Sequence, residues 1–355
     1  MTMNENFDQS KPVEIVYPFI DEALGEHASP DEAQLTIQIA DLLEHNIRTQ
    51  YSEGNARRDV HIKATGCMRA ALQVNDDIPE NLAKGIFVPG KKYEAIVRFS
   101  NGSGEPKQLS DSHGDVRGLA VKVLDVPGEK LLDTDKDART QDFVMINKPT
   151  FFVNDPQTYL TLFQKAGGNF FSKLAIPATL GLRSTVLLAE MTSSKIANPF
   201  QVQYFSASAF QHGVGENRQS VKFSIKPLSD VKGPMPHHPG DDFLREVMKN
   251  TLSKEDVVLS FMIQPKVSED LSVEDCTHEW TESVAPFYEV ARLIIPKQDF
   301  DTEELNRLGE TLSFNVWHAI AEHRPLGVVN RMRKIVYERI SRVRNQMNSV
   351  VRREP

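Results

Sequence analysis

The sequence YEAIVRFSNGSG, residues 93–104, contains the clearest strand signal of the chain. Apolar and polar side chains alternate along it with a period of two, which is typical of a half-buried β-strand. Arg98 and Ser100 therefore share one face of the strand, and Val97 and Phe99 occupy the opposite face. The run ends in Asn-Gly-Ser-Gly, a turn sequence, so we expect the chain to reverse direction there.

Similar runs recur along most of the chain and are separated by turn-rich segments such as Pro89-Gly90. With the first run they are residues 60–64, 93–100, 119–124, 143–146, 202–210, 221–227, 257–264 and 288–295. Eight strands without a regular alternation of strand and helix favour an antiparallel sheet. Such a sheet is most economically closed as a barrel. We therefore predict an α+β fold, an antiparallel eight-stranded β-barrel with surrounding α-helices.

Helical signals lie outside these runs. Ser29 and Glu32 fit a capping box that starts a helix ending near residue 50, and apolar residues recur there at helical spacing. Further helices are expected in an insert at residues 156–193, at 241–252 and at 326–344. The length of 355 residues allows one large domain or two ordinary ones.

Composition excludes several classes of protein. The chain has 41 Lys plus Arg against 49 Asp plus Glu, a net charge of −8, which argues against a general nucleic-acid binder. Two distant cysteines, Cys67 and Cys276, do not form a disulfide framework or a Cys-rich zinc site. No stretch resembles a signal peptide or a membrane span, so we expect a cytoplasmic protein.

The predicted C-terminal helix carries Arg333, Tyr337 and Arg344 on one face near Ile340. One interpretation is a solvated basic face, as most charged runs are. The alternative is that a guanidinium one turn away favours ionisation of the phenol, and tyrosinate is a suitable oxygen ligand for ferric iron. Arg344 would then neutralise a carboxylate of the cofactor. The spacing alone leaves both interpretations open.

Four segments, residues 58–66, 97–100, 115–122 and 147–152, resemble in this order the distal half of the catalase haem domain. Residues 333–344 resemble the catalase proximal helix, in which a tyrosinate binds the haem iron. The likeness extends over about residues 57–344 and is stronger to the short catalase-related peroxidases than to full-length catalases. It implies a single haem domain at residues 29–348, an N-terminal arm at 1–28 and a tail at 349–355.

The resemblance implies a role for each matching residue. His61 is the distal histidine and Asn147 the distal asparagine, while Tyr337 is the axial ligand of haem b and Arg333 its ionising partner. The other implied cofactor contacts are the propionate-binding Arg58, Arg98 and Arg344, the histidine-orienting Ser100, and the aromatic Phe151 and Phe152. Taken singly, His61 also fits an ordinary strand histidine and Asn147 a turn residue, but the joint set favours a haem site.

The function expected from this resemblance is reduction of hydrogen peroxide or organic hydroperoxides by a haem peroxidase or small catalase. An unidentified small electron donor would supply electrons when peroxide is not disproportionated. Two alternatives stay open: a fatty-acid hydroperoxide isomerase or lyase, and a barrel that binds haem without catalysis. We expect no nucleic-acid partner and no membrane span, and the family is compatible with a homo-oligomer.

Overall fold

The computed structural model describes residues 17–58, 60–103, 110–166, 176–228, 233, 235–352 and 354–355. Its strands are β1 (Ala64–Val74), β2 (Lys92–Asn101), β3 (Arg117–Leu124), β4 (Thr140–Ile146), β5 (Tyr204–Phe205), β6 (Phe210–His212), β7 (Gln219–Pro227), β8 (Val257–Pro265) and β9 (Tyr288–Ile295). Its helices are α1 (Glu32–Gln50), α2 (Pro156–Ala166), α4 (Ile176–Ser193), α5 (Phe243–Leu252), α6 (Glu303–Thr311) and α7 (Val328–Met347).

The sheet is antiparallel and closes on itself. Its strand order is β5-β4-β3-β2-β1-β9-β8-β7-β6, and β5 also pairs with β7. Eight strands, β1–β5 and β7–β9, therefore form a closed barrel, and β6 is an additional strand on β7. This arrangement confirms the predicted fold class. The short strand β5 makes the closure, because Phe205 is paired with both Ile146 and Ser224.

Two strand predictions were wrong in detail. The predicted strand at 60–64 shares only Ala64 with β1, which continues to Val74 and was otherwise missed. His61 has a left-handed backbone (φ 55°) that cannot continue a ladder. The predicted strand at 202–210 is divided into β5 and β6, with Ala207 (φ 58°) in the interruption. In both places the sequence looks β-rich, but one residue with positive φ turns the chain.

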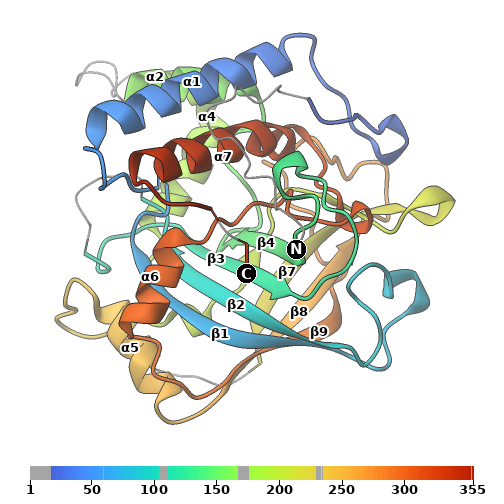
Figure 1. Cartoon of the computed structure of the whole chain (residues 1–355). Helices are drawn as coiled ribbons and strands as arrows, with labels where there is room; N and C mark the ends of the chain where they lie inside the picture. The colour runs from blue at the N-terminus through green and yellow to red at the C-terminus, as the bar shows by residue number, and fades with distance from the viewer. Residues whose placement is uncertain are drawn as a thin grey trace, which may run out of the picture.

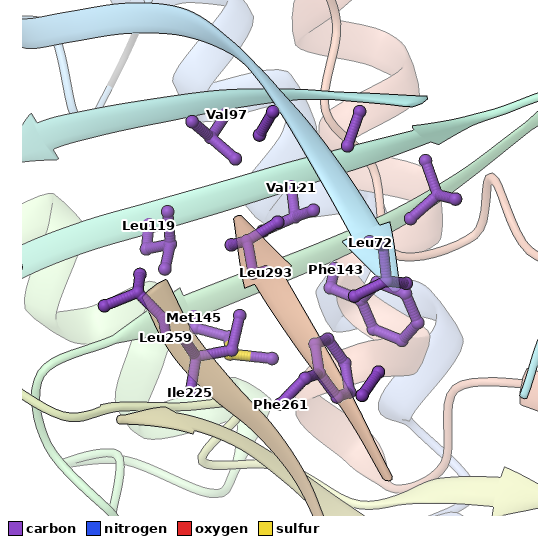
Figure 2. Close-up of a cluster of buried hydrophobic side chains, with 14 of the residues drawn as sticks. Leu72, Val97, Leu119, Val121, Phe143, Met145, Ile225, Leu259, Phe261 and Leu293 are labelled. Carbon is purple, nitrogen blue, oxygen red and sulfur yellow. The ribbon is translucent and has the colours of Figure 1, made fainter. Parts of the chain in front are cut away.

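The barrel interior is filled by apolar side chains from all long strands, as Figure 2 shows for Leu72, Val121, Phe143, Ile225 and Leu293. Burial of each such side chain contributes about 1.5–3 kcal/mol. Val97 and Phe99 of β2 also point into this core and are 0% and 1% exposed. Arg98 and Ser100 lie on the opposite face of β2 and therefore point out of the barrel.

Helices α1, α2, α4 and α7 lie together on one side of the barrel, while α5 and α6 lie near β1 (Figure 1). The apolar face of α1, with Ile39 and Leu43, packs against Val329 and Met332 of α7. The predicted helices are confirmed for the described residues, and residues 167–175 of the insert lie outside them. None of the described helices is long and apolar enough to cross a membrane.

The predicted capping box before α1 was wrong. Asp31 is the N-cap residue, its side chain makes no capping hydrogen bond, and Ser29 donates to the Asp31 carboxylate at 2.7 Å. The carboxylate of Glu32 instead binds the buried guanidinium of Arg331 on α7, with Nε at 2.7 Å. Glu32 therefore forms a buried ion pair and does not make the capping contact that the local sequence predicts.

The described parts of the predicted arm and tail are held to the body by charged contacts. Asp21 pairs with Arg218 at 2.8 Å, although residues 1–16 of the predicted arm lie outside the described part. In the tail, the carboxylate of Glu354 contacts Lys122 of β3 at 2.7 Å. Lys122 is also paired with Asp142 of β4 at 2.8 Å, so the tail is anchored on the outer face of the barrel.

Candidate functional site

His61 lies on the segment that leads into β1, and β2 holds it in place. Its left-handed backbone costs about 1–3 kcal/mol, which the surrounding contacts must offset. Its N–H donates to the carbonyl of Gly102 at 3.3 Å, and its carbonyl accepts from Arg98 Nη2 at 3.0 Å. The imidazole Nδ1 is 3.0 Å from Ser100 Oγ. Strand alternation, which places Arg98 and Ser100 on the outer face, thus positions the histidine.

The environment of His61 keeps the imidazole neutral. Burial, reinforced by the nearby guanidiniums of Arg98, Arg333 and Arg58, lowers the pKa of His61 to about 3. The ring is therefore unprotonated near pH 7, the state required to accept a proton from a substrate.

A cavity of about 150 Å³ lies between the outer face of the barrel and α7. We call it the arginine cavity. Its barrel wall includes His61, Arg98, Ser100, Gly118, Ala120 and Val144, and its helix wall includes Val336, Tyr337, Ile340, Ser341 and Arg344. His61 and Tyr337 thus stand on opposite walls of one space.

Three arginines gather at this cavity with few carboxylates to balance them. Arg58 donates to the carbonyls of Gly309 and Leu312 at 2.8 and 2.7 Å, and Arg98 Nε donates to Gly309 at 3.1 Å. The third, Arg344, is 7% exposed and makes no side-chain hydrogen bond to a residue that the structure describes. Burial, followed by repulsion from Arg98 and Arg344, lowers the pKa of Arg58 well below its usual range.

Among the residues that the structure describes, one half-exposed carboxylate, that of Glu310, lies close to these arginines. The Glu310 carboxylate lies 3.9 Å from Arg98 Nη2. Burial lowers the pKa of Arg344 to about 10, and Arg98 adds to this effect while Glu310 opposes it. Buried guanidiniums whose charged forms are disfavoured would be stabilised by an anionic group placed among them. The cavity is therefore suited to a ligand that carries carboxylates at this end.

A second cavity, of about 200 Å³, adjoins the first and shares five lining residues with it, Val60, His61, Val144, Val336 and Tyr337. We call it the aromatic cavity. Phe151, Phe152, Tyr159 and Phe163 line its outer part. The two cavities are lobes of one largely apolar space, with His61 and Tyr337 at the junction.

The face of α7 that carries Arg333, Tyr337 and Arg344 lines this space. Tyr337 borders both lobes, Arg344 borders the arginine cavity and Arg333 the aromatic cavity. The Arg333 guanidinium is held by Ser208 Oγ at 3.3 Å and Asn330 Oδ1 at 3.1 Å. Tyr337 makes no side-chain hydrogen bond to any residue in the described ranges. Its phenol is thus available to a ligand of the cavity.

Asn147 lies apart from the other predicted site residues. It follows β4, where its Oδ1 accepts from the backbone N–H of Arg117 at 2.7 Å and its Nδ2 donates to Ser194 Oγ at 3.4 Å. It is not among the residues that line either lobe. The structure therefore brings together His61, the arginines, Ser100, Tyr337 and the two phenylalanines, but not Asn147.

Two residues that the sequence interpretation did not assign also shape the site. A Cβ at Gly118 would lie 2.6 Å from Cε1 and Nδ1 of His61, so only glycine allows the ring to pack on β3. Gly309 of α6 supplies the carbonyl that binds both Arg58 and Arg98. The sequence did contain a signal for α6, because Thr302, a favoured N-cap residue, precedes two glutamates. In the structure the Thr302 hydroxyl accepts from the Leu305 N–H.

A protein-family model described as catalase matches residues 27–169, the stretch that contains His61, Arg98 and Phe152. Over this stretch the chain is similar to catalases. Among curated catalases, peroxisomal catalase A of Saccharomyces cerevisiae is 22% identical over 305 residues, which cover 78% of this chain and 55% of that protein. The catalase of Staphylococcus warneri is 31% identical over 105 residues, 30% of this chain and 18% of that protein.

Solved catalase structures have the same fold as this chain. A fungal catalase superposes with a TM-score of 0.66 at 19% identity, covering 94% of this chain and 68% of that one. A bacterial catalase gives 0.64 at 16% identity, covering 99% and 69%. The chain matches about half or less of the length of the curated catalases named above.

Proposed function

We propose that the chain is a haem-dependent peroxidase or small catalase that reduces hydrogen peroxide or organic hydroperoxides. The observation that supports this most directly is the arrangement of the arginine cavity. His61 and Tyr337 stand on opposite walls, and three guanidiniums with one nearby carboxylate gather at one end. A planar apolar ligand with two carboxylates, such as haem b, fits this combination of charge and lining.

In this proposal each part of haem has a partner. Tyr337 would bind the iron, with Arg333 as its cationic partner. The propionates would be held by Arg58, Arg98 and Arg344. The ring would pack against Phe151 and Phe152. Bound haem supplies an iron centre that exchanges electrons with peroxide. Bidentate guanidinium–carboxylate contacts would fix the register of the ligand relative to His61.

The polar side chains then handle the protons of the peroxide. His61, neutral because its pKa is lowered to about 3, takes a proton from one peroxide oxygen and returns it to the other. Ser100, 3.0 Å from Nδ1, orients the ring. Asn147 is proposed as the amide donor to the peroxide, and it must exchange its 3.4 Å contact with Ser194 to reach the substrate.

Absorption spectra of the haem-loaded wild type and Tyr337→Phe test the assignment of the iron ligand. Loss of the phenol oxygen should abolish the ferric high-spin spectrum or lower haem retention strongly. Tyr159→Phe is the matched control, because Tyr159 lines the same aromatic cavity but is not proposed as a ligand. An unchanged spectrum in Tyr337→Phe would contradict the proposal.

Turnover by His61→Ala tests the chemistry. Removal of a general base lowers the rate by about 10²–10⁴-fold, and haem content should be retained. If peroxide turnover were unchanged in this variant, a barrel that binds haem without catalysis would be the better description.

The aromatic cavity supports a second candidate function, rearrangement or cleavage of a fatty-acid hydroperoxide. Its phenylalanines next to His61 offer apolar space for an acyl chain. Product analysis with a lipid hydroperoxide separates the candidates, because a peroxidase gives the alcohol and an isomerase or lyase gives a rearranged or cleaved product.

Other features of the proposal follow from the family resemblance. We propose that the haem domain comprises residues 29–348, that it takes electrons from a small donor, and that it forms a homo-oligomer in the cytoplasm. The yeast relative is by its name a peroxisomal catalase, so fractionation of cells is the test of location. Sedimentation of the purified protein tests the oligomeric state.

A further inference from the structure

A third cavity, of about 420 Å³, lies beside the arginine cavity and has a different lining. We call it the polar cavity. Its walls come from residues 54–57 after α1, Arg245 of α5, Asn306, Gly309 and Glu310 of α6, and Asn348 after α7. Guanidinium, amide and carboxylate groups predominate, whereas the arginine and aromatic cavities are largely apolar.

Gly309 forms part of the partition between the two spaces. It lines the polar cavity, and its carbonyl accepts from Arg58 at 2.8 Å and from Arg98 at 3.1 Å. Both of those arginines line the arginine cavity. A molecule in the polar cavity is therefore separated by a single residue from the arginines proposed to hold the propionates. A donor bound there would lie on the side of the arginine cavity where the propionates are proposed to bind.

The charge of the polar cavity favours an anion. Arg57 is exposed there and makes no ion pair or side-chain hydrogen bond to a described residue. Arg245 is already paired with Asp301 at 2.8 Å, and the Glu310 carboxylate lies 3.9 Å from Arg98 Nη2.

The unengaged groups define the chemistry of the ligand more closely. The amides of Asn306 and Asn348 are occupied, by Arg245 and by the backbone of Ala56. Asn55 makes no side-chain hydrogen bond within the described ranges, so Arg57 and Asn55 are the groups free to bind. A guanidinium and an amide next to each other recognise a small anion that also carries hydroxyl groups.

We propose that the polar cavity binds a small anionic, hydroxyl-bearing electron donor next to the propionate end of the cofactor. This inference rests on the proposed peroxidase function. Hydrogen peroxide takes up two electrons and two protons and becomes two water molecules. An enediol donor such as the ascorbate anion gives two electrons and one proton and becomes dehydroascorbate, and solvent supplies the second proton.

Kinetics with two donors test the site in the haem-loaded, full-length protein. Arg57→Glu should raise KM for ascorbate about tenfold, the loss expected for one charge-assisted contact, with kcat unchanged. KM for guaiacol, an uncharged donor, and the rate of oxygen release from peroxide alone should stay within about twofold. Arg307→Glu is the matched control, because Arg307 is exposed on α6 and does not line the cavity.

Calorimetric titration of ascorbate without peroxide separates this inference from the proposed function. Saturable binding that Arg57→Glu weakens about tenfold and Arg307→Glu preserves would support the site, even if no donor were oxidised. The inference is overturned if no saturable binding is found, if both variants behave alike, or if KM for guaiacol rises as much as KM for ascorbate.

Discussion

Gly118 determines how closely the imidazole of His61 can approach β3. A Cβ at this position would lie 2.6 Å from two ring atoms and 2.9 Å from Ser100 Oγ. Gly118→Ala should therefore push the ring off the strand and break the contact between Nδ1 and Ser100. A displacement of about 1 Å in a catalytic group costs about 10²-fold in rate. We expect kcat/KM for peroxide to fall by that factor while haem content is retained.

The control for this variant is Gly240→Ala. A Cβ at Gly240 meets no atom within 4 Å, and the residue is not in a left-handed conformation, so turnover should not change. Steady-state peroxide consumption and haem absorbance check both variants. Equal activity of Gly118→Ala and the wild type would mean that the position of His61 does not limit the reaction.

At the scale of single residues, the sequence predicted which way a side chain points better than it predicted which residues that side chain contacts. Strand alternation alone placed Arg98 and Ser100 outside the barrel and Phe99 inside it, because that pattern depends only on the local period. The left-handed backbone of His61 and the orientation of Asn147 depend on contacts with Gly102 and Arg117, which are distant in sequence. No local pattern encodes such contacts.

At the scale of elements, α7 is attached to α1 by two arginines in different environments. Arg331 is fully buried and contacts Glu26, Glu32 and Glu274 at 2.7–2.8 Å. Arg331→Met would leave Glu32 and Glu274 without their cation, while Glu26 would keep Arg324 at 2.9 Å. Loss of one partner of a buried ion pair costs about 3–5 kcal/mol. The free energy of unfolding, measured by denaturant titration, should fall by that amount.

Arg339 provides the matched comparison. It also joins α7 to α1, through Asp41 and Glu44 at 2.9 and 3.1 Å, but its side chain is 24% exposed. Solvent screens this contact, so Arg339→Ala should cost about 0–1 kcal/mol. Similar losses in the two variants would show that burial of the charges is not what makes the Arg331 cluster important.

The elements themselves were predicted with uneven success. Long periodic segments such as α1 and α7 were recognised, since an apolar stripe over many turns is a strong signal. Helix α6 was missed because its nine residues contain few apolar side chains, although its Gly309 carbonyl binds two arginines of the site. Its role depends on packing against β1, where a Cβ at Gly309 would lie 2.8 Å from Cys67.

At the scale of the whole molecule, barrel closure depends on one strand of two residues, β5. A count of eight strand-like runs was enough to suggest a barrel, but the pairing of β5 with both β4 and β7 is a property of the complete sheet. The site is likewise assembled from the barrel, α6 and α7. The order of the motifs along the chain indicated which residues form one site. Only the folded chain shows that His61 and Tyr337 face the same cavity.

Acid should destabilise the folded molecule through histidines buried as neutral rings. His212 of β6 is 0% exposed, and burial lowers its pKa to about 4. In the unfolded chain its pKa is near 6.5, so between pH 6.5 and 4 the unfolded state binds a proton that the folded state excludes. The free energy of unfolding should therefore decrease as pH falls through this window, by about 3 kcal/mol for this residue.

His212→Gln removes this titration while an amide can still donate to the carbonyl of Leu82, which His212 Nε2 contacts at 3.0 Å. Urea unfolding at a series of pH values should give a shallower slope between pH 6.5 and 4, by up to about 1.4 kcal/mol per pH unit. His45→Gln, on the exposed face of α1, should leave the slope unchanged. A slope that is the same in both variants would mean that His212 does not contribute to the acid sensitivity of the folded protein.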